Sequence, residues 1–201
     1  TVSDGSGSDR KVMRAALNQF EAAGYRFEGR QLVGPDNKPL TFEILVQSPE
    51  QVKMAEAYTR TLGRLGIAAN VRLVDDSQYQ ARKDGFDYDM IIGVYSASLS
   101  PGAEQSYRWS SKAKDVNGSF NYAGTADPAI DALIDDIVAA RSREDFVAAV
   151  RAYDRVLISG HYVVPLFHLP EQRLARWAFI KHPETTPLYG YQLPTFWRAP
   201  Q

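Results

Sequence analysis

The stretch VYSASLSPGAEQSYRW, residues 94–109, combines hydroxyl groups, an amide and aromatic rings with only two charged side chains. It comes just after the short apolar run Met90-Ile91-Ile92. Flat apolar rings beside a few polar groups are typical of clefts that bind small molecules. We therefore predict a ligand-binding site lined by Tyr95, Ser96, Ser98, Gln105, Tyr107 and Trp109. The alternative is that the rings cap the core and the serines only fill a loop.

Residue types that support catalysis or metal binding are also present, but their spacing does not assemble a site. His161 and His168 are seven residues apart, which places them on opposite faces of an extended chain, and His182 precedes a proline. The chain has no cysteine, no Gly-x-Ser-x-Gly elbow and no glycine-rich phosphate loop. We therefore expect no catalytic residue, no metal site and no cofactor.

Two groups of aspartates have spacings that suggest metal binding. The first lies at helical spacing, and apolar residues fill the other side of the same helix, which favours a solvated helix face; its members are Asp127, Asp131, Asp135 and Asp136. The second is interrupted by aromatic rings and lacks the downstream glutamate of a calcium loop; its members are Asp84, Asp87 and Asp89.

Apolar periodicity and capping residues predict the elements that position the ligand-binding stretch. Stripes with a helical period indicate helices that begin after Asp9, at Ser48-Pro49, near residue 76, at Asp127-Pro128 and after Ser142. The buried stripe of the fourth helix should contain Ile130, Leu133, Ile134, Ile137 and Val138. Strands are expected at 25–27, 31–33, 41–46, 67–73, 90–92, 162–167 and 174–179. The unbroken apolar run at 90–92 favours a strand that is buried on both faces.

The order of strands and helices over residues 41–94 predicts crossover connections. We therefore expect an α/β fold with a mixed, mostly parallel sheet and helices on both faces. In such sheets, ligands bind outside the carboxyl ends of the strands. The run 90–92 ends at Gly93, so the predicted site lies at that edge of the sheet.

Composition excludes several classes of partner. With 23 basic and 24 acidic residues, the net charge is −1, which provides no field to attract nucleic acid or an anionic membrane. No apolar run has the length of a transmembrane helix, and the first nine residues do not read as a secretory signal. The remaining expectation is an ordinary globular chain that can bury a core.

Three segments resemble the C-terminal half of the periplasmic substrate-binding proteins of ABC importers, the oligopeptide/dipeptide-binding family (solute-binding family 5). The segments are residues 38–82, 86–105 and 119–168. The most specific pattern is Asn121-Tyr122 followed by Asp127-Pro128, then a helix pair and Val164-Pro165-Leu166.

This resemblance implies one lobe of a type II periplasmic-binding-protein fold, with residues 1–201 as a single C-terminal solute-binding lobe. A family member closes two lobes on a peptide or similar solute and delivers it to an ABC permease in the membrane. The implied function is non-enzymatic binding of an oligopeptide or peptide-like solute in the periplasm, with the signal peptide on the full-length parent.

The C-terminal segment is rich in proline and aromatic residues and has no periodicity of its own. The resemblance implies that residues 166–201 return to an N-terminal lobe that this chain does not encode. Aromatic side chains bury large areas, so without that lobe we expect the segment to self-associate or to fold back on itself.

Two other functions stay open at this point. One is a small α/β hydrolase-type enzyme that uses Glu104 or His168 as its base. The other is an interaction module that binds no small ligand.

Overall fold

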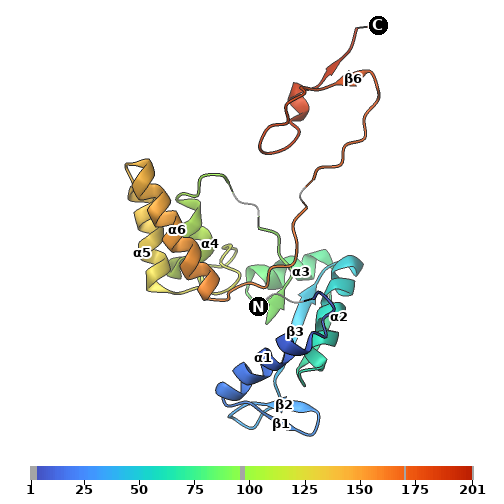
Figure 1. The fold of residues 1–201 in the computed structure, drawn as a ribbon, viewed down its shortest axis with the longest axis vertical. Coiled ribbons are helices and arrows are strands. Elements are labelled where there is room, and N and C mark those ends of the chain that lie inside the picture. The colour runs from blue at the N-terminus through green and yellow to red at the C-terminus, as the bar shows by residue number, and fades with distance from the viewer. Residues whose placement is uncertain (1–3, 96–97, 170, 201) are drawn as a thin grey trace. The chain divides into compact units, whose positions relative to one another are not determined.

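The protein is described by a computed structural model that covers residues 4–95, 98–169 and 171–200 (Figure 1). The chain divides into two compact units, Thr1–Tyr162 (unit 1) and Val163–Gln201 (unit 2). Within the described ranges, no helix is both long enough and apolar enough to cross a membrane.

Unit 1 begins with a capped helix and a hairpin. Helix α1 (Arg10–Ala22) starts after Asp9, whose carboxylate accepts hydrogen bonds from the backbone N–H groups of Lys11 and Val12. These are donors that the first turn of a helix cannot satisfy internally. Strands β1 (Arg26–Glu28) and β2 (Gln31–Val33) form an antiparallel hairpin. The apolar core of this region is formed by Met13, Ala16, Leu17, Phe20, Leu32, Leu62, Leu65 and Ile67.

A parallel sheet with strand order β4-β3-β5 forms the centre of unit 1. Its strands are β3 (Thr41–Val46), β4 (Ala68–Leu73) and β5 (Met90–Ile91), connected by α2 (Pro49–Gly63) and α3 (Asp76–Asp84). The Ser48 hydroxyl caps α2 by accepting a hydrogen bond from the N–H of Gln51, and the Asp75 carboxylate caps α3 in the same way. The predicted crossover connections and parallel sheet are confirmed.

Helices cover both faces of this sheet, as predicted. Ala55 of α2 packs against Ile44 and Val46 on one face. On the opposite face, Arg82 of α3 forms an ion pair with Glu43. The two contacts lie on different faces because successive side chains of a strand alternate.

The strand that is buried on both faces is β3, and the prediction for residues 90–92 was wrong. Ile44, Leu45 and Val46 are 2%, 0% and 0% exposed, whereas Met90 and Ile91 are only half-buried. The reason is position, because β3 lies between two strands, and β5 pairs with β3 alone among the described residues. An apolar run in the sequence indicates a hydrophobic strand, but it does not indicate whether that strand lies in the middle of the sheet.

The second half of unit 1 is helical (Figure 1). α4 (Glu104–Trp109) and η1 (Ser111–Ala113) lead to a hairpin of α5 (Pro128–Ala139) and α6 (Arg143–Ser159). The predicted caps, Asp127 and Ser142, are confirmed. The buried residues between the two helices are Ile130, Ile134, Ile137 and Tyr153. Val138, predicted in the same stripe, is instead 56% exposed, because one further residue rotates a side chain by about 100° around the helix axis.

The segment between α4 and α5 is held together by the side chain of Asn121, which is fully buried. Its Nδ2 donates to the carbonyl oxygens of Ser110, at 3.0 Å, and Thr125, at 2.8 Å. Its Oδ1 accepts a hydrogen bond of 2.8 Å from the N–H of Thr125. Nearby, the buried Ser119 hydroxyl donates to the carbonyl of Ala113. These hydrogen bonds replace those that the buried backbone groups would otherwise make to water.

Unit 2 contains a short antiparallel pair, β6 (Ile180–Lys181) with β7 (Trp197–Arg198), and the turn η2 (Leu193–Thr195). The ring of His182 lies 5.0 Å from that of Tyr191 and 5.4 Å from that of Phe196, measured between centroids. These contacts give unit 2 a small aromatic centre of its own.

The strands predicted at 162–167 and 174–179 are absent, so this prediction was wrong. Side chains in the first segment are largely exposed, including Val164 at 53% and Phe167 at 73%. A strand is stable only when a neighbour pairs with its backbone, and neither segment has such a neighbour within the described part of the chain. Residue composition alone therefore overstated the strand content.

We predict that Asn121→Ala lowers the free energy of unfolding by about 3 kcal/mol, because three buried hydrogen bonds are lost and their partners remain unsatisfied. Urea unfolding followed by circular dichroism measures the change. The matched control is Asn117→Ala, at an exposed position, with an expected effect within about 0.5 kcal/mol. Equal effects of the two substitutions would contradict the role given to Asn121.

Candidate functional site

The segment that leaves the carboxyl end of β5 lies beside the N-terminal part of α3. The hydroxyl of Tyr79 donates a hydrogen bond of 3.2 Å to the carbonyl of Ile92, which fixes the chain where the strand ends. Gly93 and Val94 follow and are exposed, Val94 at 94%. Tyr95 is the first ring after the strand.

Tyr95 stacks on Trp109 of α4. The ring centroids are 5.5 Å apart and the planes differ by 18°. Tyr162 lies next to Trp109, with centroids 6.3 Å apart. Trp109 and Tyr162 both pack against the core between α5 and α6. The chain after β5 is therefore joined to the helical half of unit 1 through ring contacts.

A second series of rings continues from Tyr95. Tyr122 lies 6.5 Å from Tyr95, Phe120 lies 6.0 Å from Tyr122, and Tyr107 lies 5.7 Å from Phe120, again between centroids. We call the whole group the aromatic cluster: Tyr95, Tyr107, Trp109, Phe120, Tyr122 and Tyr162. Its outer rings reach solvent, with Tyr95 40% and Tyr107 50% exposed.

The structure brings together three of the predicted site residues, Tyr95, Tyr107 and Trp109, in this cluster. Ser96 lies outside the described residues. Ser98 is exposed, and its hydroxyl donates to the carbonyl of Ser100.

Gln105, the remaining predicted residue, is engaged by two side chains. Its Oε1 accepts a hydrogen bond of 2.9 Å from the hydroxyl of Tyr153, and its Nε2 donates to Glu104 at 3.0 Å. The first bond ties α4 to α6. Gln105 thereby helps to orient the helix that carries Tyr107 and Trp109.

Three members of the aromatic cluster were not predicted as site residues: Phe120, Tyr122 and Tyr162. Tyr122 belongs to the pair Asn121-Tyr122, which was noted only as part of a family pattern. Because Asn121 fixes the backbone beside it, Tyr122 is placed among the rings. An asparagine flanked by two aromatic residues was therefore the available signal, but the sequence reveals neither that it is buried nor which rings it faces.

Desolvation opposes the ionisation of three phenols at the cluster, those of Tyr88, Tyr95 and Tyr122. It raises the pKa of Tyr88 to about 12, with smaller contributions from Tyr95, Tyr122 and Tyr79. Desolvation also raises the pKa of Tyr95 and the pKa of Tyr122. Tyr88 is fixed by a hydrogen bond of 2.9 Å from its hydroxyl to the carbonyl of Tyr122. These three phenols therefore stay protonated to a higher pH than an ordinary tyrosine does.

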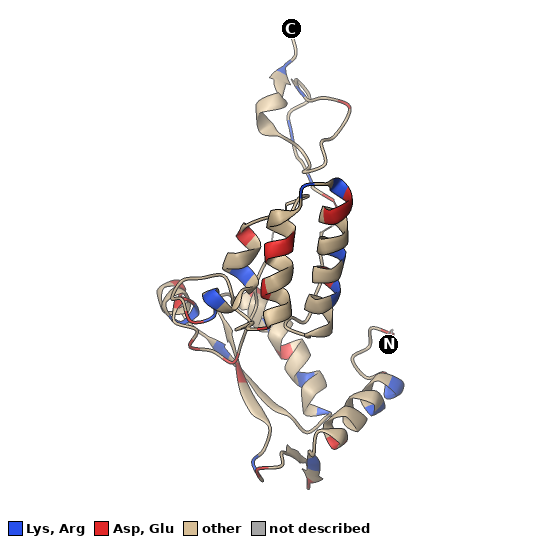
Figure 2. Ribbon diagram, turned by 90° about the vertical axis from the view of Figure 1, so that its left-hand side faces the viewer, with Lys and Arg blue, Asp and Glu red and all other residues tan. Residues whose placement is uncertain are grey.

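A cation borders the cluster as well. The Lys83 ammonium lies 5.8 Å from the ring centroid of Tyr122 and 5.9 Å from that of Tyr79, within the range of cation–π attraction. Elsewhere, the helices of unit 1 together carry both acidic and basic residues (Figure 2).

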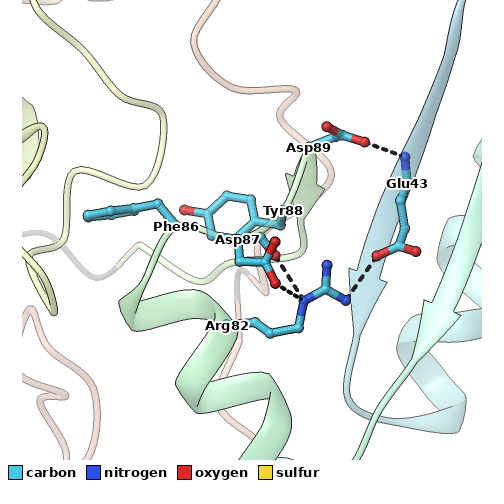
Figure 3. Close-up of a pocket in the computed structure, with 6 residues that line it drawn as sticks. All are labelled: Glu43, Arg82, Phe86, Asp87, Tyr88 and Asp89. Atoms are coloured by element: carbon cyan, nitrogen blue, oxygen red, sulfur yellow. Dashed lines mark hydrogen bonds and ion pairs between the residues drawn. The ribbon is translucent and has the colours of Figure 1, made fainter.

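A polar hollow of about 450 Å³ lies at the amino end of β5 (Figure 3). It is lined by Glu43, Arg82, Phe86, Asp87, Tyr88 and Asp89. The Arg82 guanidinium contacts Glu43 at 3.0 Å and Asp87 at 2.9 Å. The Asp89 carboxylate accepts a hydrogen bond of 2.8 Å from the N–H of Glu43. These contacts join α3 and the start of β5 to β3, so they support the sheet.

Members of both groups of aspartates have structural partners. Asp127 caps α5, and the Asp131 carboxylate accepts hydrogen bonds from the N–H and the hydroxyl of Ser111. In the second group, Asp84 accepts a hydrogen bond from Gln80, and the other two line the polar hollow. The described residues contain no cluster of three or more metal-ligating side chains.

Comparisons with known proteins identify relatives of the whole chain. The family described as "bacterial extracellular solute-binding proteins, family 5", in its middle region, matches residues 4–117. A binding protein of Brucella suis is 56% identical over 100% of this chain and 32% of its own length. The peptidoglycan-binding protein YepA of Agrobacterium fabrum is 49% identical over 98% of this chain and 32% of its own length. The chain thus spans about a third of the length of these curated relatives.

Solved structures share the fold. A periplasmic oligopeptide-binding protein of Thermotoga maritima, bound to mannohexaose, has a TM-score of 0.65 and 17% identity over 76% of this chain and 30% of its own. The oligopeptide-binding protein AppA of Bacillus subtilis, bound to a nonapeptide, has a TM-score of 0.61 and 18% identity over 71% of this chain and 29% of its own. The predicted α/β fold, that of one lobe of a type II periplasmic-binding protein, is confirmed.

Alkaline pH should destabilise unit 1. Because the pKa of Tyr88 is about 12 when folded and about 10 when unfolded, only the unfolded state loses this proton in between. The contribution of Tyr88 to stability is then full below about pH 10 and falls by about 1–2 kcal/mol towards pH 12. Urea unfolding midpoints at pH 9, 10 and 11 measure the slope.

Tyr88→Phe should make this slope shallower, because other tyrosines with raised pKa values remain, and should cost about 1 kcal/mol at pH 7 through the lost hydrogen bond. Tyr107→Phe, at a ring that is half exposed, is the matched control. If stability falls with pH equally steeply in Tyr88→Phe and in the natural chain, the raised pKa assigned to Tyr88 is wrong.

Proposed function

The chain belongs to family 5 of the bacterial extracellular solute-binding proteins, and from this membership we propose that it forms one lobe of a binding protein that captures a peptide or peptide-like solute for an ABC importer. The aromatic cluster at the carboxyl edge of the sheet carries this proposal. It combines exposed ring faces, neutral hydroxyl groups and a neighbouring ammonium, which suits a solute held by stacking and a few polar contacts. We assign the solute-contacting role to the predicted residues Tyr95, Ser96, Ser98, Gln105, Tyr107 and Trp109.

Two observations support a peptide-like solute. The relative from Agrobacterium fabrum is named a peptidoglycan-binding protein, and peptidoglycan contains short peptides. The structures from Thermotoga maritima and Bacillus subtilis are named oligopeptide-binding proteins. Peptidoglycan and free oligopeptides both contain a peptide backbone. We propose that the solute contains one as well.

The rest of the binding protein would supply the opposite wall of the cleft. We propose that residues 166–201 pack on an N-terminal lobe of the parent protein and that the two lobes close on the solute in the periplasm. Closure changes the populations of open and closed forms, and an ABC permease that binds only one form can detect the difference. The signal peptide would belong to the parent protein.

An enzyme remains the alternative from another class, and the site offers it little support. Family 5 is a family of solute-binding proteins. The hydrogen bond from Gln105 contributes most to lowering the pKa of Glu104, and the N–H of Gly102 adds to it, whereas a general base at neutral pH needs a raised pKa. His168, the other candidate base, is exposed. Catalytic turnover that disappears in Glu104→Gln or His168→Ala would favour the enzyme.

The proposed function predicts how the full-length parent protein binds its solute. Adding a peptide mixture should change the fluorescence of Trp109, and Tyr107→Ala should weaken the affinity by about 10-fold, as expected when an aromatic side chain at a binding surface is truncated. Phe27→Ala, at an exposed ring on β1, is the matched control with unchanged affinity. A flat titration over a broad peptide library would end the peptide assignment.

A further prediction concerns the self-association of residues 1–201 when they are studied without the rest of the parent protein. Unit 2 exposes Trp177 at 74% and Trp197 at 49%, and large exposed apolar patches promote association. Sedimentation velocity should show a coefficient that rises with concentration, and the double substitution Trp177→Ser with Trp197→Ser should abolish the rise. Leu73→Ser, at an exposed residue of unit 1, is the control. A monomer at all concentrations, with a solvent-mobile C-terminal segment, would contradict the prediction.

A further inference from the structure

Tyr95 differs from three neighbouring tyrosines in how it is held. The hydroxyls of Tyr79, Tyr88 and Tyr153 all donate hydrogen bonds to protein acceptors. The hydroxyl of Tyr95 makes no hydrogen bond to the described residues, so this ring is held by its aromatic contacts. Such contacts require only a flat ring of suitable size, and they carry no specificity for tyrosine.

The partner ring is held far more firmly. Trp109 belongs to α4, which is tied to α6 through the hydrogen bond between Gln105 and Tyr153. It packs against the core formed by Ile130, Ile134 and Ile137. The stack therefore consists of one ring that is fixed and one that depends on a single short segment.

The chain that carries Tyr95 has few contacts to lose. Val94 is 94% exposed and Gly93 is also exposed. Segments with few buried contacts open at low free-energy cost. Moving Tyr95 away from Trp109 would thus sacrifice mainly the stacking itself.

We propose that Tyr95 is a displaceable cover on a ring-binding face of Trp109, and that a ring of the solute takes its place when the solute binds. This inference rests on the proposed solute-binding function and names the chemistry of one subsite. The ligand group is a ring with an apolar face, which an aromatic side chain or the C–H face of a sugar of the solute can supply. Exchange of one ring for another keeps the stacking energy nearly constant, so the cover protects Trp109 from water without blocking the site.

The test uses residues 1–201 with Trp177→Phe and Trp197→Phe, so that Trp109 is the remaining tryptophan. Acrylamide quenching of its fluorescence reports how well the ring is covered. The probes are the peptide Ala-Phe-Ala, its ring-free match Ala-Ala-Ala, and the sugar trimer chitotriose. Variants are Tyr95→Ala, the conservative Tyr95→Phe, and Phe27→Ala as the control outside the site.

The proposal predicts that Tyr95→Ala increases quenching in the absence of any probe and that Tyr95→Phe does not. It also predicts that Ala-Phe-Ala or chitotriose restores protection, with an affinity about 2- to 10-fold tighter in Tyr95→Ala than in the background chain, because the ligand no longer competes with Tyr95. Ala-Ala-Ala should have no effect. Which of the two ring probes protects Trp109 identifies the source of the ring.

Two results would overturn the proposal. Unchanged quenching in Tyr95→Ala, with near-ultraviolet circular dichroism showing an intact fold, would mean that Tyr95 does not cover Trp109. Increased quenching that neither ring probe reverses, or ring binding that weakens in Tyr95→Ala, would mean that the exposed face is not a ring subsite. Either result leaves the proposed solute binding to be judged separately by the peptide titration of the parent protein.

Discussion

The buried amide of Asn121 is the constraint on which the candidate site depends. Its three hydrogen bonds join the residue that follows α4 to the residues that precede α5. Trp109 comes immediately before Ser110, and Tyr122 comes immediately after Asn121. One side chain thus sets the distance between the two ring-bearing segments. A buried amide is expensive unless all its groups are bonded, so this arrangement tolerates little variation in the backbone around it.

The aromatic cluster that results consists of aromatic rings and phenol groups. Its rings contribute apolar area, and burial raises the pKa of two of its phenols, those of Tyr95 and Tyr122. Some charged groups of unit 1 have structural roles elsewhere, as with Arg82 between Glu43 and Asp87. A site of this kind can hold a molecule through shape and stacking, but it supplies little of the perturbed acid–base chemistry that catalysis usually needs. Stacking and shape are thus the interactions that the site offers, in agreement with membership of a solute-binding family.

Local chemistry made much of the fold predictable. Caps such as Asp9, Ser48 and Asp127 act within three or four residues of themselves, so their effects can be deduced from sequence. The predictions that failed depended on distant partners. Residues 90–92 were expected to be the most buried strand, but burial depends on which strand is central, and residues 162–167 lacked a strand to pair with. The same limit applies to the site, because Tyr95, Tyr107 and Trp109 lie in one stretch, whereas Phe120, Tyr122 and Tyr162 join them only through tertiary contacts.

The hairpin of α5 and α6 has a consequence for how the chain reaches its native state. The two helices are separated by residues 140–142, and the contacts between them join residues that are close in sequence. Closing a short loop costs little chain entropy and is fast, whereas the sheet must bring together strands that are separated by whole helices. We therefore expect the hairpin to assemble early and to present a ready surface on which Trp109 docks. The parallel strands form more slowly, and Tyr95 then stacks on the ring of Trp109, which is already in place.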